Sequence, residues 1–298
     1  MLDFIRRAFG SEQATKRRGA TGPLPPTDRA SVLTPQDQQY EMQQLVAATG
    51  QSVGRQRDHN EDSVVAITTT LAGKSANVPF GLYVVADGMG GHEFGEVASN
   101  AAIRVIAGDI LRKFHSYLFA IPTQQPEESL QEIVAHAIEH AHRSIQQQAP
   151  GSGTTVTAAL ILGQQMTVGH VGDSRAYIVP AAGPLEQLTQ DHSLVRRLEE
   201  LGHLNKEEAA SFPHRNVLIR ALGQGDSLEV DVFTLPFPRN STFMLCTDGL
   251  WGVLRDADIR RALAEAPNLV RACQNLVQAA NSAGGPDNIS VVLVQMIG

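Results

Sequence analysis

The chain has 298 residues, of which 42% are hydrophobic and 18% are charged, so it carries enough apolar material for a sizeable folded core. Its formal net charge of −7 leaves no overall positive field to attract nucleic acid or an anionic membrane. These values exclude a mainly disordered chain and argue against a nucleic-acid-binding protein.

The cysteines indicate a reducing compartment. Only Cys246 and Cys273 occur, each within an apolar pattern, and they form no C-x-x-C or related arrangement. No stretch reaches the roughly eighteen consecutive apolar residues that a membrane-spanning helix needs. We therefore expect a cytoplasmic protein without disulfides and without an integral membrane span.

The N-terminal segment, 1–44, differs in composition from the rest. It is basic, rich in Pro, Gly, Ser and Thr, and poor in large apolar residues, which predicts a disordered tail and linker. Apolar residues and arginines alternate at its very start. That start is either a frayed terminus or a short amphipathic helix for weak peripheral contact with a membrane or partner. Residues 45–298 are expected to form one folded domain.

From residue 45 onward, short runs rich in β-branched residues end at Gly, Asp or Asn, and these patterns predict strands. The predicted strands span 63–68, 80–86, 154–162, 166–172, 174–179, 228–235, 241–247 and 289–296. Apolar residues at a period near 3.6 predict helices instead. The longer helices are expected at 95–114, 128–148 and 268–280, with shorter ones at 192–201 and 256–263.

The order of these elements indicates the fold class. Consecutive strands between residues 154 and 179 are joined by turns too short for crossover helices, so we expect them to pair antiparallel. A doubly wound parallel sheet is thereby excluded. We predict an α+β fold, a four-layer α-β-β-α sandwich of two central antiparallel sheets flanked by helices, because it buries every apolar face.

Acidic residues recur where predicted strands begin or end. They are Glu61, Asp62, Asp87, Asp173, Asp248 and Asp287. A single Asp-Gly at a strand end is usually a turn residue, but several such sites can meet at one edge of a sandwich. Clustered carboxylates repel one another unless a cation holds them, and an all-oxygen set suits Mg²⁺ or Mn²⁺ rather than Zn²⁺. The pattern favours a divalent metal site.

Seven motifs, in this order, carry a resemblance to a known family. They are R-x-x-N-E-D, D-G-M-G-G-H, S-G-T-T, V-G-D-S-R-A-Y, L-T-x-D-H, T-D-G-L-W and D-N-I-S. Over about 45–296 the chain resembles the bacterial branch of the metal-dependent Ser/Thr protein phosphatases, the type 2C family. The resemblance implies hydrolysis of phosphoserine and phosphothreonine in proteins by a hydroxide that bridges two metal ions. It also implies phosphorylated protein substrates and an opposing Ser/Thr kinase, and we expect a monomer.

The resemblance assigns metal ligands as well. Asp87 is similar to the aspartate that bridges two Mn²⁺ or Mg²⁺ ions, with the Gly88 carbonyl on one of them. Asp248 and Asp287 resemble the other direct ligands. Asp173 resembles the carboxylate that joins Asp248 in a third, weaker metal site.

Other residues resemble those that handle water and phosphate. Glu61 and Asp62 match acidic positions that orient metal-bound water. Arg57 matches the arginine that grips the substrate phosphate, a role that suits its planar guanidinium, and Arg55 is the competitor for that role. Asn288 would be a neighbouring polar contact among the catalytic residues.

His92 has two open interpretations. Eukaryotic members carry a candidate acid histidine two residues after the bridging aspartate, where this chain has Met89. His92 matches the position found in bacterial relatives and could protonate the leaving alkoxide or contact phosphate. A structural role at the start of the following helix is the alternative.

The segment 188–224 matches in position the variable flap beside the active site of bacterial members. Its mixture of charged helix and loop suits a mobile lid that contacts protein substrates. A solvated peripheral helix is the other interpretation.

Two further function classes compete with the phosphatase hypothesis. His136, Glu139 and His140 fit H-x-x-E-H, a zinc-peptidase signature, on a predicted helix, although the same residues suit the polar face of an outer helix. The second is a phosphatase-like module that binds phosphoproteins without turnover. It predicts the loss of metal carboxylates, and none of those expected is missing. Hydrolysis of a small phosphomonoester would use the same residues.

Overall fold

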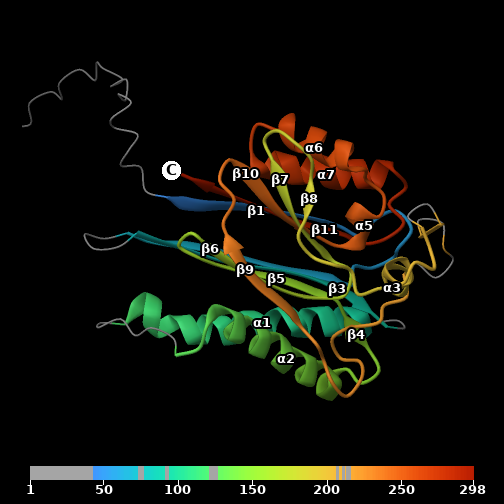
Figure 1. The fold of residues 1–298 in the computed structure, drawn as a ribbon, viewed down its shortest axis with the longest axis horizontal. Helices are drawn as coiled ribbons and strands as arrows, with labels where there is room; N and C mark the ends of the chain where they lie inside the picture. The colour runs from blue at the N-terminus through green and yellow to red at the C-terminus, as the bar shows by residue number, and fades with distance from the viewer. Residues whose placement is uncertain are drawn as a thin grey trace, which may run out of the picture. The chain divides into compact units, whose positions relative to one another are not determined.

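Two antiparallel sheets lie face to face in the folded part of the chain, and helices cover both outer faces (Figure 1). The computed structural model describes residues 43–72, 77–90, 94–120, 127–205, 208–209, 212 and 216–298. The predicted tail, 1–44, lies outside the described residues except for its last two positions. The predicted four-layer α-β-β-α sandwich is confirmed.

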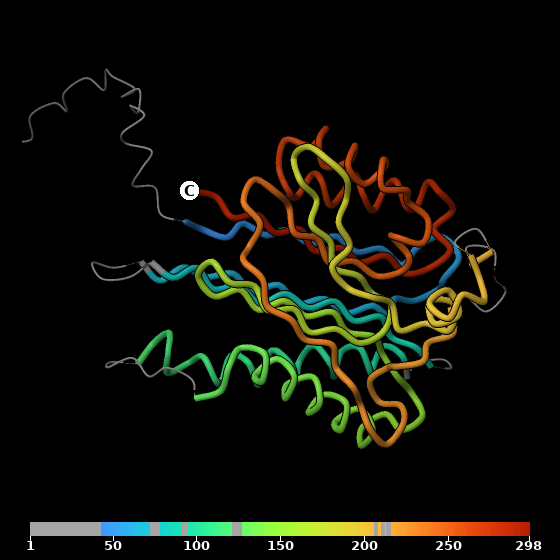
Figure 2. Tube along the Cα trace, in the orientation of Figure 1, coloured from blue at the N-terminus to red at the C-terminus, as the bar shows by residue number. Residues whose placement is uncertain are grey.

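The first sheet joins the earliest and the latest strands of the described chain. Across the sheet the strands are β1 (Gln44–Ser52), β11 (Ile289–Ile297), β10 (Ser241–Cys246), β7 (Arg175–Pro180) and β8 (Glu186–Gln187). All neighbours pair antiparallel. β1 and β11 pair along their whole length, so the two ends of the described chain run side by side (Figure 2).

The second sheet is built from the middle of the chain. Its strands are β2 (Asp62–Ala72), β3 (Asn77–Met89), β5 (Val156–Leu162), β6 (Gln165–Val171) and β9 (Asp231–Pro236), with the short β4 (Gly153–Thr154) pairing on β3. The antiparallel pairing expected from short turns holds for β5 and β6. It fails for β6 and β7, because the chain crosses to the first sheet at that turn.

Helices cover each sheet on one side. α1 (Phe94–Phe119) and α2 (Leu130–Gln148) lie on the second sheet, and α6 (Asp256–Ala264) and α7 (Leu269–Ser282) lie on the first (Figure 1). The short α3 (Leu194–Glu200) and α5 (Asp248–Trp251) lie at one end of the sandwich. None of the described helices has the length and apolarity needed to span a bilayer.

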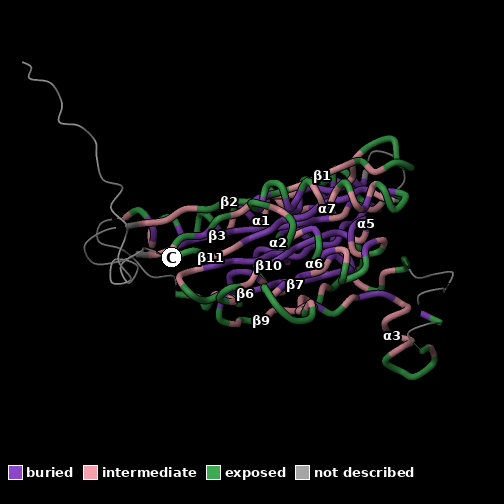
Figure 3. Tube along the Cα trace, turned by 90° about the horizontal axis from the view of Figure 1, so that it is seen from above, coloured by how far each residue is buried: buried purple, intermediate pink, exposed green. Residues whose placement is uncertain are grey.

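Apolar side chains fill the space between the sheets and beneath each helical layer. Tyr83, Phe243 and Val292 are fully buried between the sheets. Leu82 and Leu160 belong instead to the cluster under α1 and α2. Because β3 and β5 are buried on both faces, their sequences are almost continuously apolar. Figure 3 shows β3 in the interior and α3 at the exposed periphery.

Several elements differ from the sequence prediction: β1, β8 and α5 were not predicted, and β2, β3 and α1 extend beyond their predicted bounds. β1 was missed because its sequence, QLVAATGQS, is short of aromatic and branched residues, and only Leu45 and Ala48 are buried. Pairing with β11, rather than local propensity, forms this strand. α1 continues beyond its predicted end at residue 114, because Leu118 still packs into the core under the helices.

Candidate functional site

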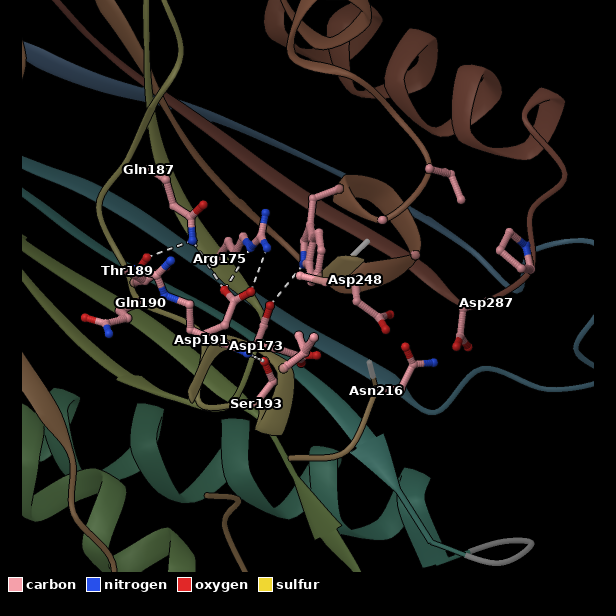
Figure 4. Close-up of a pocket in the computed structure, with 18 of the residues that line it drawn as sticks. Asp173, Arg175, Gln187, Thr189, Gln190, Asp191, Ser193, Asn216, Asp248 and Asp287 are labelled. Atoms are coloured by element: carbon pink, nitrogen blue, oxygen red, sulfur yellow. Dashed lines mark hydrogen bonds and ion pairs between the residues drawn. The ribbon is translucent and has the colours of Figure 1, made fainter. Parts of the chain in front are cut away.

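Strand ends from both sheets bring the acidic residues together at one edge of the sandwich. Asp62 and Asp87 face each other across the β2–β3 pair. In the other sheet, the end of β10 lies between the starts of β7 and β11. Asp173, Asp248 and Asp287 each lie two residues beyond one of these strand ends, and Figure 4 shows them around one hollow. Antiparallel pairing is therefore the reason that the carboxylates converge.

A cavity of about 240 Å³ opens at this edge. Its lining includes these residues singled out from the sequence: Arg57, Glu61, Asp87, Gly88, Asp173, Asp248 and Asp287. Asp62 is buried beside Asp87. Asp87 keeps some exposed surface where it reaches the cavity, although protein atoms surround its carboxyl group. The residues named from strand ends thus form one site.

Burial and mutual repulsion raise the pKa values of these carboxyl groups. Burial raises the pKa of Asp62 to about 7, although the Thr247 hydroxyl donates a hydrogen bond to this carboxylate. Burial, and then the charge of Asp248, raises the pKa of Asp173 to about 8. Burial, and then the charges of Asp62 and Asp248, raises the pKa of Asp87 well above its usual value. The cluster therefore needs positive charge to be fully ionised near neutral pH.

Three features of the site fit a divalent cation. The donors are carboxylate and carbonyl oxygens, which hard cations prefer. Asp62 Oδ1 is buried and has no hydrogen-bond partner among the described residues. A Cβ atom at Gly88 would lie 2.2 Å from the carbonyl oxygen of Gly95, so only glycine allows the end of β3 to approach the start of α1 so closely.

The carboxylates nevertheless do not yet lie close enough together to coordinate a metal ion. In the part of the chain that the structure describes, no three His, Cys, Asp or Glu side chains form a group that could hold a metal ion as it stands. Asp62 and Asp287 are each held by a neighbouring side chain. Asp62 Oδ2 accepts from Thr247 at 2.8 Å, and Asp287 Oδ2 accepts from Arg57 at 2.7 Å. Binding of a cation would have to compete with these two contacts.

Arg57 is the basic residue at the site. Its Nη2 donates to Asp287, its side chain is 48% exposed, and it lines the cavity. Arg55 is exposed and is not part of that lining; its backbone N–H donates to the Gly285 carbonyl. The geometry therefore favours Arg57 over Arg55 as a phosphate contact.

Asn288 supports the site instead of lining it. Its buried side chain accepts from the Glu61 backbone N–H and donates to the carbonyls of Val53 and His59. These three bonds hold the loop that carries Arg57. His92 lies outside the described residues, so its two interpretations stay as they were.

Threonines that the sequence analysis left without a role hold the acidic strand ends. Thr155 Oγ1 accepts from the Asp87 backbone N–H, and the Thr155 N–H donates back to the Asp87 carbonyl. Thr247, from the first sheet, instead donates a hydrogen bond from its hydroxyl to the carboxylate of Asp62. Both threonines occur in quoted motifs, S-G-T-T and T-D-G-L-W, but nothing in the local sequence says which aspartate each one contacts.

A larger cavity of about 930 Å³ adjoins the acidic cluster and shares Arg57, Asp173, Asp248 and Asp287 with it. One wall comes from the predicted flap segment, 188–224, and includes residues of α3. No residue of α3 is buried. The lining also contains Arg175 and Trp251, with the Arg175 guanidinium 3.3 Å from the centroid of the Trp251 ring. The predicted flap thus borders the site.

The histidines of α2 do not form a comparable site. His136 contacts Glu128, and His140 Nδ1 lies 2.6 Å from Asp109 Oδ2. Glu139 pairs with Arg143 on the same helix. These side chains are directed to separate partners on an exposed face, and the described residues hold no group of ligands there. The zinc-peptidase alternative has no structural support.

A buried carboxylate cluster beside an arginine, at the edge of an α-β-β-α sandwich, defines a class of enzyme that hydrolyses phosphate esters with divalent cations. The chain belongs to the protein phosphatase 2C family, whose model matches residues 46–201. It is 37% identical over 244 residues to the serine/threonine phosphatase stp of Listeria welshimeri, a match that covers 81% of this chain and 92% of that relative.

Solved structures agree with the family assignment. The serine/threonine phosphatase of S. agalactiae is similar with a TM-score of 0.69 and 33% identity, over 84% of this chain and 99% of that one. The catalytic domain of PstP, in complex with two manganese ions, is similar with a TM-score of 0.67 and 29% identity, over 86% and 100%. The predicted family, fold and enzyme class, a protein-serine/threonine phosphatase, are confirmed, and the family is metal-dependent.

Proposed function

We propose that the protein removes phosphate from phosphoserine and phosphothreonine in other proteins, with Mn²⁺ or Mg²⁺ as cofactor, and so reverses the action of a Ser/Thr kinase. One observation carries the proposal: aspartates from the ends of strands in both sheets surround one cavity beside Arg57. Membership of the protein phosphatase 2C family supports the same reaction.

The carboxylates would hold the cations. Asp87, the Gly88 carbonyl, Asp248 and Asp287 are the proposed ligands of two ions, and Asp173 with Asp248 would hold a third, weaker one. The cations, when bound, supply a hydroxide nucleophile near neutral pH and neutralise charge that develops on the phosphoryl oxygens. Their charge also offsets the repulsion that raises the pKa of each aspartate.

Acidic residues around this set would orient water. Asp62 is fixed by the Thr247 hydroxyl at one oxygen, and its other oxygen is left to accept from a water molecule. Glu61 lines the cavity, and its backbone N–H is held by Asn288 at 2.8 Å. We therefore assign Asn288 a positioning role instead of a direct catalytic one.

Arg57 would bind the substrate phosphate. Its guanidinium is half exposed, reaches the acidic cluster and can present two N–H groups to two phosphate oxygens. The pairing with Asp287 keeps this group at the mouth of the site before substrate arrives. His92 is the proposed proton donor to the departing seryl or threonyl oxygen.

The larger cavity suits a protein substrate. A peptide whose phosphorylated residue enters the acidic cluster could extend along the wall formed by the flap, 188–224. This favours a phosphoprotein over a small phosphomonoester. We propose a cytoplasmic monomer with a catalytic domain at 45–298 and a tail, 1–44, that makes at most weak peripheral contacts.

Hydrolysis of p-nitrophenyl phosphate and of a phosphothreonine peptide tests the proposal. Both should be cleaved with Mn²⁺, neither with EDTA, and excess Mn²⁺ should restore the rate. Activity that survives EDTA, or that Zn²⁺ alone sustains, would remove the two-metal mechanism. Binding of the phosphopeptide without release of phosphate would favour the non-enzymatic module instead.

A further inference from the structure

The L-T-x-D-H motif, which the proposed chemistry does not use, holds the turn that carries Asp173. His192 is buried, with 5% of its surface exposed. Its backbone N–H donates to the Gly172 carbonyl at 2.7 Å, and its ring Nδ1 accepts from the Gly172 N–H at 3.2 Å. One residue of the flap segment therefore holds both polar backbone groups of the residue before Asp173.

Neighbouring contacts leave this turn little freedom. Asp191 makes a bidentate ion pair with Arg175, at 2.8 and 2.6 Å, on the other side of the turn. Trp251 Nε1 donates to the Asp173 carbonyl at 3.0 Å. Gly172 has a φ of +109°, and a Cβ there would lie 2.6 Å from the Cβ of Thr155, so glycine is required. Asp173 itself faces the cavity, near Arg175, Asp191 and Asp248 (Figure 4).

The other edge of the His192 ring connects to the far end of the flap segment. Nε2 lies 3.1 Å from Asp231 Oδ2, and Arg220 Nη1 donates to the other oxygen of Asp231 at 3.1 Å. The Ile219 N–H donates to the His192 carbonyl at 2.9 Å. The ring also packs on His170, with centroids 4.9 Å apart. The Nδ1 that accepts from Gly172 is unprotonated, which leaves Nε2 as the donor to Asp231.

We infer that His192 is a positioning residue: it fixes Asp173 for the Asp173–Asp248 cation site, and through Asp231 and Arg220 it connects that turn to the start of β9 and to the end of the flap segment. The inference rests on the proposed function, since it concerns the weakest of the proposed metal sites. Groups that hold a ligand in place tune metal affinity by about tenfold to a hundredfold. A displacement of His192 would therefore change the affinity of this site for Mn²⁺.

Another buried histidine offers a matched control. His142 is 4% exposed, and its Nδ1 accepts from the Gly223 N–H at 3.0 Å. The bond type is the same as that of His192 and the burial is similar, but the backbone group that His142 holds belongs to Gly223 and not to the turn of Asp173. A purely structural role predicts the same behaviour for both histidines.

The test compares His192→Leu, His192→Asn, Asp231→Ala and His142→Leu in the full chain. Mn²⁺ binding is titrated by calorimetry, and exchange of the Gly172 amide proton is followed by NMR. His192→Leu should speed Gly172 exchange and weaken the weakest Mn²⁺ site by about tenfold or more. His192→Asn should stay within about threefold of wild type, because Asn Oδ1 takes the place of Nδ1. Asp231→Ala should give a smaller loss in the same direction.

The control variant and the contrary outcomes distinguish the positioning role of His192 from the proposed phosphatase function. His142→Leu should lower the unfolding midpoint as His192→Leu does, without weakening Mn²⁺ binding. The inference is wrong if His192→Leu leaves Gly172 exchange unchanged, or if it loosens Gly172 while Mn²⁺ binding stays as in wild type. Wild-type protein that neither binds Mn²⁺ nor cleaves phosphate would overturn the proposed function and the metal part of this inference. Gly172 exchange would still decide the contact with His192.

Discussion

Two regions of the molecule carry residues that commonly bind metal ions, and they differ in how those residues are brought together. At the sheet edge, carboxylates from both sheets meet around one cavity. On α2, His136 and His140 lie one turn apart on an outer face, with 59% and 53% of their side chains exposed. Spacing along one helix places residues on a common face. A site that surrounds a metal ion needs ligands from several elements that converge.

Electrostatics separates the two regions further. His136 and His140 on α2 each have their own acidic neighbour. In the cluster, burial makes ionisation of Asp87 and Asp173 costly, and the charges of neighbouring aspartates add to that cost. Strongly perturbed carboxyl groups in a cavity are typical of functional sites, whereas solvated ion pairs contribute little.

The largest expected effect comes from the cluster itself. Asp87→Asn and Asp248→Asn each remove a charge that we assign to cation binding, so kcat should fall by about a thousandfold or more. Steady-state hydrolysis of p-nitrophenyl phosphate at saturating Mn²⁺ measures this. Asp226→Asn, at an exposed turn position, is the control and should retain full activity. Retention of more than a tenth of the rate in Asp87→Asn would contradict the assignment.

A smaller effect is expected from the arginine beside the cluster. Arg57→Ala should raise KM by about tenfold, because a charge-assisted pair with phosphate is lost. Arg55→Ala should leave KM within about twofold, since Arg55 does not line the acidic cavity. The pair of variants, assayed on the same phosphothreonine peptide, distinguishes the two arginines. A raised KM in Arg55→Ala alone would reverse the assignment.

The raised pKa values predict how metal-free protein responds to pH. Asp62 and Asp173 have pKa values of about 7 and about 8 in the folded state, against about 4 in an unfolded chain. Between these limits the folded state binds more protons, so the free energy of unfolding contributed by these groups falls as pH rises from about 4 to about 8. Mn²⁺ favours the ionised forms and should offset this loss.

Melting temperatures in EDTA at pH 5.5 and at pH 8.5 measure this effect, with and without Mn²⁺. Asp173→Asn removes one of the titrating groups, so the fall in melting temperature between the two pH values should be smaller in this variant than in wild type. An identical pH dependence in both proteins would show that Asp173 has no raised pKa.

The smallest effect is expected on α2. His136→Ala and His140→Ala should keep activity within about twofold and change the free energy of unfolding by less than about 1 kcal/mol, as exposed substitutions usually do. Phosphatase assays with Mn²⁺, and thermal unfolding, provide the measurements. An inactive His136→Ala enzyme would restore the zinc-peptidase interpretation and remove the contrast between the two regions.

Much of the site follows from local patterns. Apolar runs that end in Asp-Gly marked the ends of β3 and β10, and a sandwich of antiparallel sheets allowed several such strand ends to meet at one edge. The prediction did less well where local signals are weak. β1 depends on its pairing with β11, and β7 leaves the sheet of β6 although only a short turn joins the two strands.

By itself, the sequence determined the family, the layered fold and the identity of the acidic residues, because these depend on residue types and on patterns within single elements. Only the tertiary structure decided that Thr247 binds Asp62, 185 positions away, that Arg57 rests on Asp287, and that His192 holds the turn of Asp173. Such contacts form when the two sheets and the flap pack together. They join residues that are far apart in the sequence, so no local pattern predicts them.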